Sequence, residues 1–171
     1  AGKWDLYKRF RFNEQYQRGR LKQKKQDDVT VCCTWKQAED AQALVSLYLQ
    51  FCEHKNGWRR RDLAYYKNQF LPNAAIWKQK VRIYMENEQP KGYIVQEETA
   101  EELHIRECIY ADAESLQHML QHFAQEERTV YVDLDTEAQV EGRSKLETCM
   151  MVKQLQEQSF PQDRLFIREE L

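Results

Sequence analysis

Two histidines and a carboxylate recur at every fourth residue of one predicted helix. His118, His122 and Glu126 would lie on one helix face, and imidazole and carboxylate groups at this spacing can hold a zinc ion. That face is opposite the apolar one, and no nearby cysteine completes a ligand set. The pattern therefore favours a solvated polar face over a metal site.

Arg59, Arg60 and Arg61 form a run of guanidinium groups that could bind a phosphate. Asp62 follows directly and compensates part of this charge, so a charged, solvated first helical turn is the favoured interpretation. Serine-nucleophile motifs, P-loops and dinucleotide fingerprints are absent from the sequence. No single motif therefore assigns a chemistry to the chain.

The centre of the chain predicts three consecutive strands. Residues 80–85 alternate apolar and polar side chains, residues 87–92 supply turn formers, and Tyr93–Val95 resumes a β-rich run. A third strand, Leu103–Tyr110, follows a polar break, and its alternation predicts that four side chains share one face. These four are Leu103, Ile105, Glu107 and Ile109.

A helix and a fourth strand follow. Asp112 can cap the helix, whose apolar residues recur at helical spacing: Leu116, Met119, Leu120 and Phe123. Thr129–Val132 is β-branched and aromatic, as a buried central strand tends to be. The predicted order is therefore strand, strand, strand, helix, strand.

A strand and a helix are predicted before this core. Val29–Cys33 is predicted as the strand, and Thr34 with Gln37 has the form of a capping box for a helix that ends near Asn56–Gly57. The apolar positions of this helix are Ala41, Leu44, Val45, Tyr48 and Cys52.

A second helix is predicted from Arg59 to Phe70, and Pro72–Asn73 is expected to end it. After residue 133 the pattern weakens. Thr148–Val152 is predicted as a last strand.

The element order and several short motifs resemble GNAT-superfamily N-acetyltransferases. Gly92–Val95 is similar to the "GY-x-V" strand of the second GNAT-like domain of Eis-type enzymes, and Leu103–Glu107 is similar to its "L-x-V-x-E" strand. Ala111–Leu116 is similar to the "A-D-x-E-A-L" helix start that follows. The resemblance runs from about Val29 to Met151. It implies an α+β, GNAT-like (acyl-CoA N-acyltransferase) fold with a mixed, mostly antiparallel sheet flanked by helices.

A working GNAT domain has a glycine-rich turn after its central strand, where backbone amides hold the CoA pyrophosphate. Here residues 109–114 contain no glycine and two carboxylates, Asp112 and Glu114. The resemblance is therefore to the degenerate second unit, a non-catalytic scaffold and acceptor-pocket wall. Acetyl-CoA is then the cofactor of the parent enzyme, with none expected on this chain. The implied partners are a catalytic GNAT domain, in cis or in trans, and further copies in an oligomer.

The same resemblance implies two catalytic candidates. Tyr7 lies in a segment similar to the end of a GNAT domain, where a tyrosine protonates the departing CoA thiolate, although Arg11 stands where the family usually has glycine. The alternative for Tyr7 is an amphipathic ring on a strand. Glu107 lies where many GNAT enzymes place the general base for the acceptor amine. The favoured alternative for Glu107 is a buried or interfacial carboxylate paired with an arginine.

The amino-terminal residues carry most of the positive charge. Residues 1–26 contain nine Lys or Arg and two carboxylates, a net +7 in a chain whose total is −2. We expect residues 1–26 to include the last strands of a preceding GNAT domain, 27–155 to form the GNAT-like domain, and 156–171 to be a carboxyl-terminal extension. The alternative is a stand-alone interaction domain that binds a protein or nucleic acid through the basic segment, with nucleic acid the less favoured partner.

Composition limits the class of protein. The 171 residues are 42% hydrophobic and 32% charged, which suits one soluble domain with some extra chain. No apolar run approaches the roughly 20 residues that span a bilayer, and the first residues lack a signal-peptide pattern, so we expect a cytoplasmic protein without a membrane partner. Five cysteines without a C-x-x-C pair favour reduced thiols.

Overall fold

Seven strands form one mixed sheet in a computed structural model that describes residues 13–23, 34–53, 60–134 and 143–152. The spatial order is β2-β3-β4-β5-β6-β1-β7. All neighbouring strands are antiparallel except β5 and β6, which are parallel. The strands are β1 (Asn13–Gln23), β2 (Thr34–Gln37), β3 (Lys80–Glu86), β4 (Gln89–Glu98), β5 (Glu102–Tyr110), β6 (Thr129–Leu134) and β7 (Arg143–Val152).

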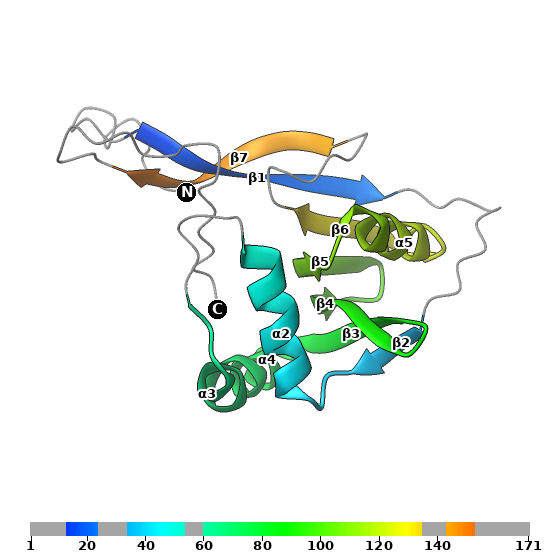
Figure 1. The fold of residues 1–171 in the computed structure, drawn as a ribbon. Coiled ribbons are helices and arrows are strands. Elements are labelled where there is room, and N and C mark those ends of the chain that lie inside the picture. Colours follow the sequence, from blue (N-terminus) through cyan, green and yellow to red (C-terminus); the bar gives the residue numbers. More distant parts are fainter. Residues whose placement is uncertain (1–12, 24–33, 54–59, 135–142, 153–171) are drawn as a thin grey trace.

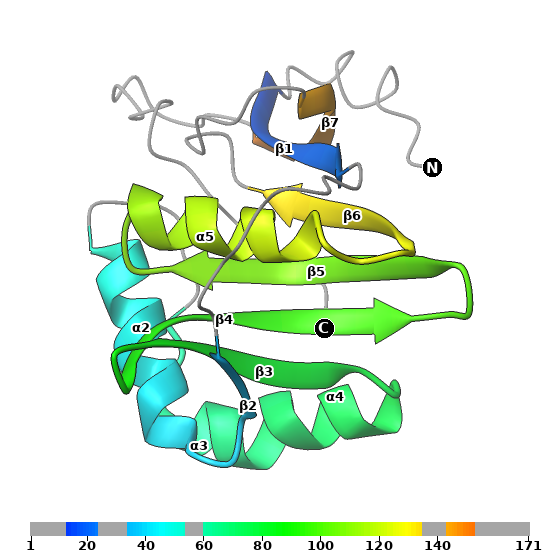
Figure 2. The same cartoon turned by 90° about the vertical axis from the view of Figure 1, so that its right-hand side faces the viewer.

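Helices lie on both faces of the sheet. One face carries α2 (Ala41–Cys52), α3 (Leu63–Tyr65), a π-helical turn η1 (Tyr66–Phe70) and α4 (Leu71–Ile76), and the other carries α5 (Ala113–Phe123) (Figure 1, Figure 2). The described residues therefore form two apolar cores, which we name the α2 core and the α5 core after their helices. Among the helices of the described ranges, none is long and apolar enough to cross a membrane.

The predicted order of the central elements is confirmed. The β3–β4 hairpin turns at Asn87 and Glu88, which both have positive φ (47° and 65°), as a two-residue type I′ loop requires. Helix α5 begins after Asp112, which caps it as predicted. Strand β6 follows and lies inside the sheet, between β5 and β1.

The start of the first helix was predicted wrongly. Thr34 and Gln37 belong to strand β2 rather than to a capping box, and they pair with Met85 and Arg82. Asp40 caps α2 instead, and its carboxylate accepts a hydrogen bond from Gln42 N at 2.8 Å. The predicted strand Val29–Cys33 lies outside the described residues.

The helix expected to end at Pro72 continues through it. Asp62, rather than Arg59, marks its start by accepting from Tyr65 N, and its last residue is Ile76. Before the proline the helix widens, because Leu71 N donates to the carbonyl of Tyr66 five residues earlier. Such a π-helical turn adjusts the hydrogen-bond ladder where proline offers no N–H, so Pro72 is tolerated within the helix.

Strand β5 does not keep its four alternating residues on one face, which corrects that prediction. Val95 pairs with Glu107 and Gln96 pairs with Ile105, so Arg106 is an extra residue, a β-bulge. Leu103 and Ile105 lie in the α5 core, whereas Ile109 lies in the α2 core. The bulge therefore reverses the faces of the strand between residues 105 and 107.

Part of the basic amino-terminal segment is a strand. Residues 13–23 form β1, which pairs with both β6 and β7. The predicted strand residues Leu6–Phe12, including Tyr7, lie outside the described residues. The division of the chain at residues 26 and 155 stays a prediction.

Candidate functional site

The two parallel strands part at their carboxyl ends. Their pairing runs from Glu102 opposite Thr129 to Ile105 opposite Val132 and does not continue. Beyond that point β5 follows β4 as far as Tyr110, whereas β6 follows β1. Ligands of α/β sheets commonly bind outside the carboxyl ends of parallel strands, where neighbouring connections diverge. This parting of β5 and β6 is therefore the candidate site.

The start of α5 lies beside this parting, and the side-chain carboxylate of Asp112 caps it. Asp112 accepts from Ser115 N at 2.8 Å and from Ser115 Oγ at 2.7 Å. The hydrogen bond from the Ser115 amide holds the pKa of Asp112 below its usual range. The Asp112 carboxylate thus takes a first-turn amide that a bound phosphate would use, and Glu114 adds a second negative charge. These residues do not suit a coenzyme diphosphate.

A buried ion pair lies directly after the bulge of β5. Arg61 donates from Nη1 to Glu107 Oε1 at 2.8 Å and from Nη2 to Oε2 at 3.2 Å, and the two residues are 3% and 2% exposed. Tyr93 donates its hydroxyl to Glu107 Oε1 at 2.5 Å, and the hydroxyls of Tyr66 and Tyr93 are 2.9 Å apart. The Arg61 guanidinium also stacks over the ring of Tyr48, 4.4 Å from its centre. We refer to Arg61, Glu107, Tyr93 and Tyr66 as the buried network.

Burial and charge fix the protonation of these groups. Burial raises the pKa of Tyr66 and Tyr93 well above that of a free phenol, and the negative charge of Glu107 raises it further. Burial alone would lower the pKa of Arg61, but the neighbouring Glu107 outweighs it and raises that pKa. The tyrosines therefore stay neutral donors and Arg61 stays charged.

The structure pairs Glu107 with an arginine, as its favoured interpretation predicted. A general base needs a free lone pair within reach of its substrate, and here both carboxylate oxygens accept hydrogen bonds inside the protein. The catalytic roles of Glu107 and Tyr7 stay predictions. The solvated turn proposed for the arginine run is wrong for Arg61, which is buried, whereas Arg60 is exposed. The sequence signals for this network were a glutamate within an apolar strand and the run of three arginines, which no sequence pattern connected.

The predicted histidine face of α5 does not gather into one cluster. His118 Nδ1 lies 2.6 Å from Glu86 Oε1 and thereby joins the helix to the β3–β4 hairpin. His122 packs against Trp35, with ring centres 5.6 Å apart, so this side chain is half-buried rather than solvated. Burial lowers the pKa of His122, although Glu126 opposes the change. Within the described ranges, no group of three metal-ligating side chains is found.

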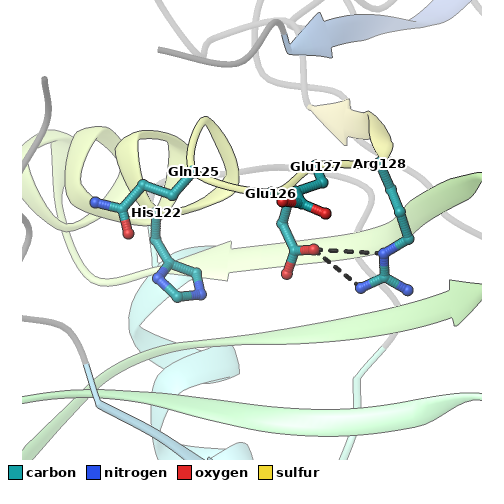
Figure 3. A pocket seen from close by; sticks show the side chains of 5 residues that line it. All are labelled: His122, Gln125, Glu126, Glu127 and Arg128. Carbon is teal, nitrogen blue, oxygen red and sulfur yellow. Dashed lines mark hydrogen bonds and ion pairs between the residues drawn. The ribbon is translucent and has the colours of Figure 1, made fainter. Parts of the chain in front are cut away.

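An open groove of about 460 Å³ lies at the carboxyl end of α5. Figure 3 shows its lining residues, His122, Gln125, Glu126, Glu127 and Arg128. Arg128 donates to Glu126 Oε2 from Nη2 at 3.0 Å and to Glu98 from Nη1 at 3.1 Å, so its charge is compensated. The groove lies at the opposite end of α5 from Asp112 and is not part of the candidate site.

Comparison of the structure with solved proteins identifies the fold. A protein of Enterococcus faecalis V583, described as a conserved protein of unknown function and probable N-acyltransferase, gives a TM-score of 0.61 at 15% identity over 88% of this chain. GCN5-related N-acetyltransferases from Anabaena variabilis and Kribbella flavida give 0.56 and 0.51, at 13% and 14% identity, over 84% and 80% of this chain. The chain has the GNAT fold.

The three solved proteins are longer than the matched region. The chain spans 43%, 41% and 35% of their respective lengths. No protein-family model matches the sequence, and no curated protein matches it. The GNAT fold predicted from the sequence is therefore confirmed, while the resemblance to the second domain of Eis-type enzymes stays a prediction.

Proposed function

We propose that this chain is a GNAT-like module of an Eis-like N-acetyltransferase, in which it serves as a non-catalytic scaffold and wall of the acceptor pocket. The parent enzyme would transfer an acetyl group from acetyl-CoA to an amine. The observation that carries the proposal is the start of α5, where Asp112 caps the amide that a coenzyme phosphate would need.

The buried network supports the same role. In an acetyltransferase the acceptor amine has to lose a proton to a base that touches it. Glu107 is 2% exposed and is bound by Arg61 and Tyr93, so it is suited to holding the sheet together. A catalytic GNAT domain, in the same polypeptide or in another, would then supply the coenzyme site. The greater length of the three solved proteins is consistent with such a partner.

Titration of the purified chain with acetyl-CoA tests the proposal. We expect no saturable heat and no rise in melting temperature up to millimolar coenzyme. A ligand at 100 times its dissociation constant would stabilise the chain by about 2.7 kcal/mol, or roughly 5–10 °C at this size. A saturable micromolar response would therefore contradict a non-catalytic role.

A control with a polyanion distinguishes specific coenzyme binding from electrostatic attraction of any anion to the basic amino-terminal segment. Heparin should not stabilise the chain if the basic segment belongs to a folded GNAT unit. Salt-sensitive heparin binding that disappears when Lys8, Arg9 and Arg11 are changed to Gln would instead promote the alternative, an interaction domain that binds through this segment.

A further inference from the structure

The sequence of strand β5 would also allow a second pairing register with β4, one without the β-bulge. If Ile105 kept its place opposite Val132 and the bulge were absent, residue 107 would lie opposite Ile94 instead of Val95. Ile94 belongs to the α5 core, so Glu107 would enter that core together with Leu103 and Ile105. This is the arrangement that the simple alternation of the strand predicts.

Apolar burial alone does not choose between the two arrangements. Both faces of β5 are covered, one by α2 and η1 and the other by α5, so Ile109 and Cys108 would be buried on either side. The residue whose environment differs most is Glu107. In the bulged strand it receives two hydrogen bonds from Arg61 and one from Tyr93. In the regular strand it would lie beside Ile94 among the apolar side chains of the α5 core, with Arg82 one strand farther away, opposite Ile94 on β3. An ionised carboxylate without partners in an apolar core is strongly disfavoured.

We propose that the Arg61–Glu107 ion pair specifies the bulged register of β5. Replacing a buried ion pair by apolar groups of similar volume is often harmless to stability. The best-attested role of a buried ion pair is to select one structural arrangement among several. Here it holds residue 107 on the α2 side and thereby places the extra residue at Arg106. This role concerns the fold itself and does not depend on the proposed function.

The test replaces the pair as a unit in the whole chain, as Arg61→Met/Glu107→Leu. Cross-strand NMR contacts report the register, because residue 107 faces Val95 in the bulged strand and Ile94 in the regular one. We expect a second set of amide signals for residues 103–110 in the variant, from a second register with a population of roughly 10% or more. In the unmodified chain this second set should not be detected. The matched control is Lys80→Met/Glu98→Leu, which removes an exposed ion pair between β3 and β4 together with the contact from Arg128 to Glu98, and which should leave one set.

Deletion of Arg106 in the double variant removes the choice of register. Ile105 and residue 107 would become neighbours, opposite Gln96 and Val95, so both halves of β5 keep their faces in a regular strand. We expect this deletion to restore one set of signals. A single set with residue 107 opposite Val95 in the double variant itself would overturn the proposal.

If the double variant does not fold, deletion of Arg106 from it distinguishes a conflict of register from a simple loss of stability. Recovery of folding on deletion of Arg106 supports a conflict of register as the cause. Failure of both chains to fold overturns the proposal, because the pair would then be required for stability whatever the register.

Discussion

Gly92 has no room for a side chain, and this gives a sharp test of the packing between β4 and β5. It pairs with Tyr110 at the end of β5 that leads to α5. A Cβ at position 92 would lie 2.6 Å from the carbonyl oxygen of Ile109 and 3.0 Å from Sδ of Met119. Ordinary contact begins at 3.4 Å, so the backbone oxygen would have to move by about 0.8 Å, the difference between 3.4 and 2.6. We therefore predict that Gly92→Ala destabilises the protein.

Two effects of opposite sign determine how far Gly92→Ala changes the free energy of unfolding. Alanine restricts the unfolded chain more than glycine does, which stabilises a protein by about 0.4–1 kcal/mol where the site is free of strain. Overpacking a well-packed site costs about 1–3 kcal/mol. Because the closest atom belongs to the backbone of a paired strand, the second effect should win. We expect a net loss of about 1–2 kcal/mol and a melting temperature lower by roughly 2–8 °C.

Urea unfolding of the unmodified chain and of Gly92→Ala measures this loss as a lower midpoint at constant slope. Met119→Ala is the matched background, because it removes the sulfur contact and keeps the contact with the Ile109 oxygen. Gly92→Ala should cost about as much in that background as in the unmodified chain. A midpoint that rises or does not change for Gly92→Ala would refute the reasoning, since the entropy of the unfolded chain would then dominate.

Two further predictions concern the cap of α5 and the buried network. Asp112→Ala should lower the free energy of unfolding by about 1 kcal/mol at pH 7, and Asp112→Asn by much less, because the helix loses its capping acceptor only in the first variant. The hydrogen bond from Ser115 lowers the pKa of Asp112, so the stabilisation is present above the usual carboxyl range and is lost as the pH falls through the lowered pKa. Urea midpoints should therefore show the difference from Asp112→Ala shrinking below about pH 4, and a constant difference down to pH 2 would contradict the capping role. Tyr93→Phe should cost about 1–3 kcal/mol by the same assay, because Glu107 loses a donor and Tyr66 loses the acceptor of its hydroxyl; a loss below about 0.5 kcal/mol would show that the network compensates.

The central elements of the fold were predictable because local signals and tertiary packing agree there. Apolar alternation identified β3 and β5, and Asp112 at the N-cap with Leu116 and Phe123 on one face identified α5. Strand β3 and helix α5 each meet a core with the face that their own residues mark as apolar, whereas β5 does so only as far as Ile105, before the bulge. The sequence therefore predicts both the element type and its order.

The features that sequence patterns missed depend on partners far along the chain. Arg61 looked like a surface charge because its partner, Glu107, lies 46 residues away on another element. Strand β2, which begins at Thr34, was missed because three of its four residues are exposed and it lacks an alternating apolar face. It is a strand because it pairs with β3. Pro72 is a reliable helix breaker only while the turn before it is α-helical, and the wider turn at Tyr66–Phe70 is not a local signal.

One extra residue accounts for two features of this sheet. A bulge bends its strand and increases its twist, and β5 stops pairing with β6 at Ile105, directly before the bulge residue Arg106. The same residue turns Glu107 toward Arg61 and away from the α5 core. The parting of the parallel strands and the reversal of faces therefore share one cause, and neither requires the residues that would bind a coenzyme at the start of α5. A chain can thus keep the GNAT geometry while Asp112 closes that helix start, as the proposed scaffold role requires.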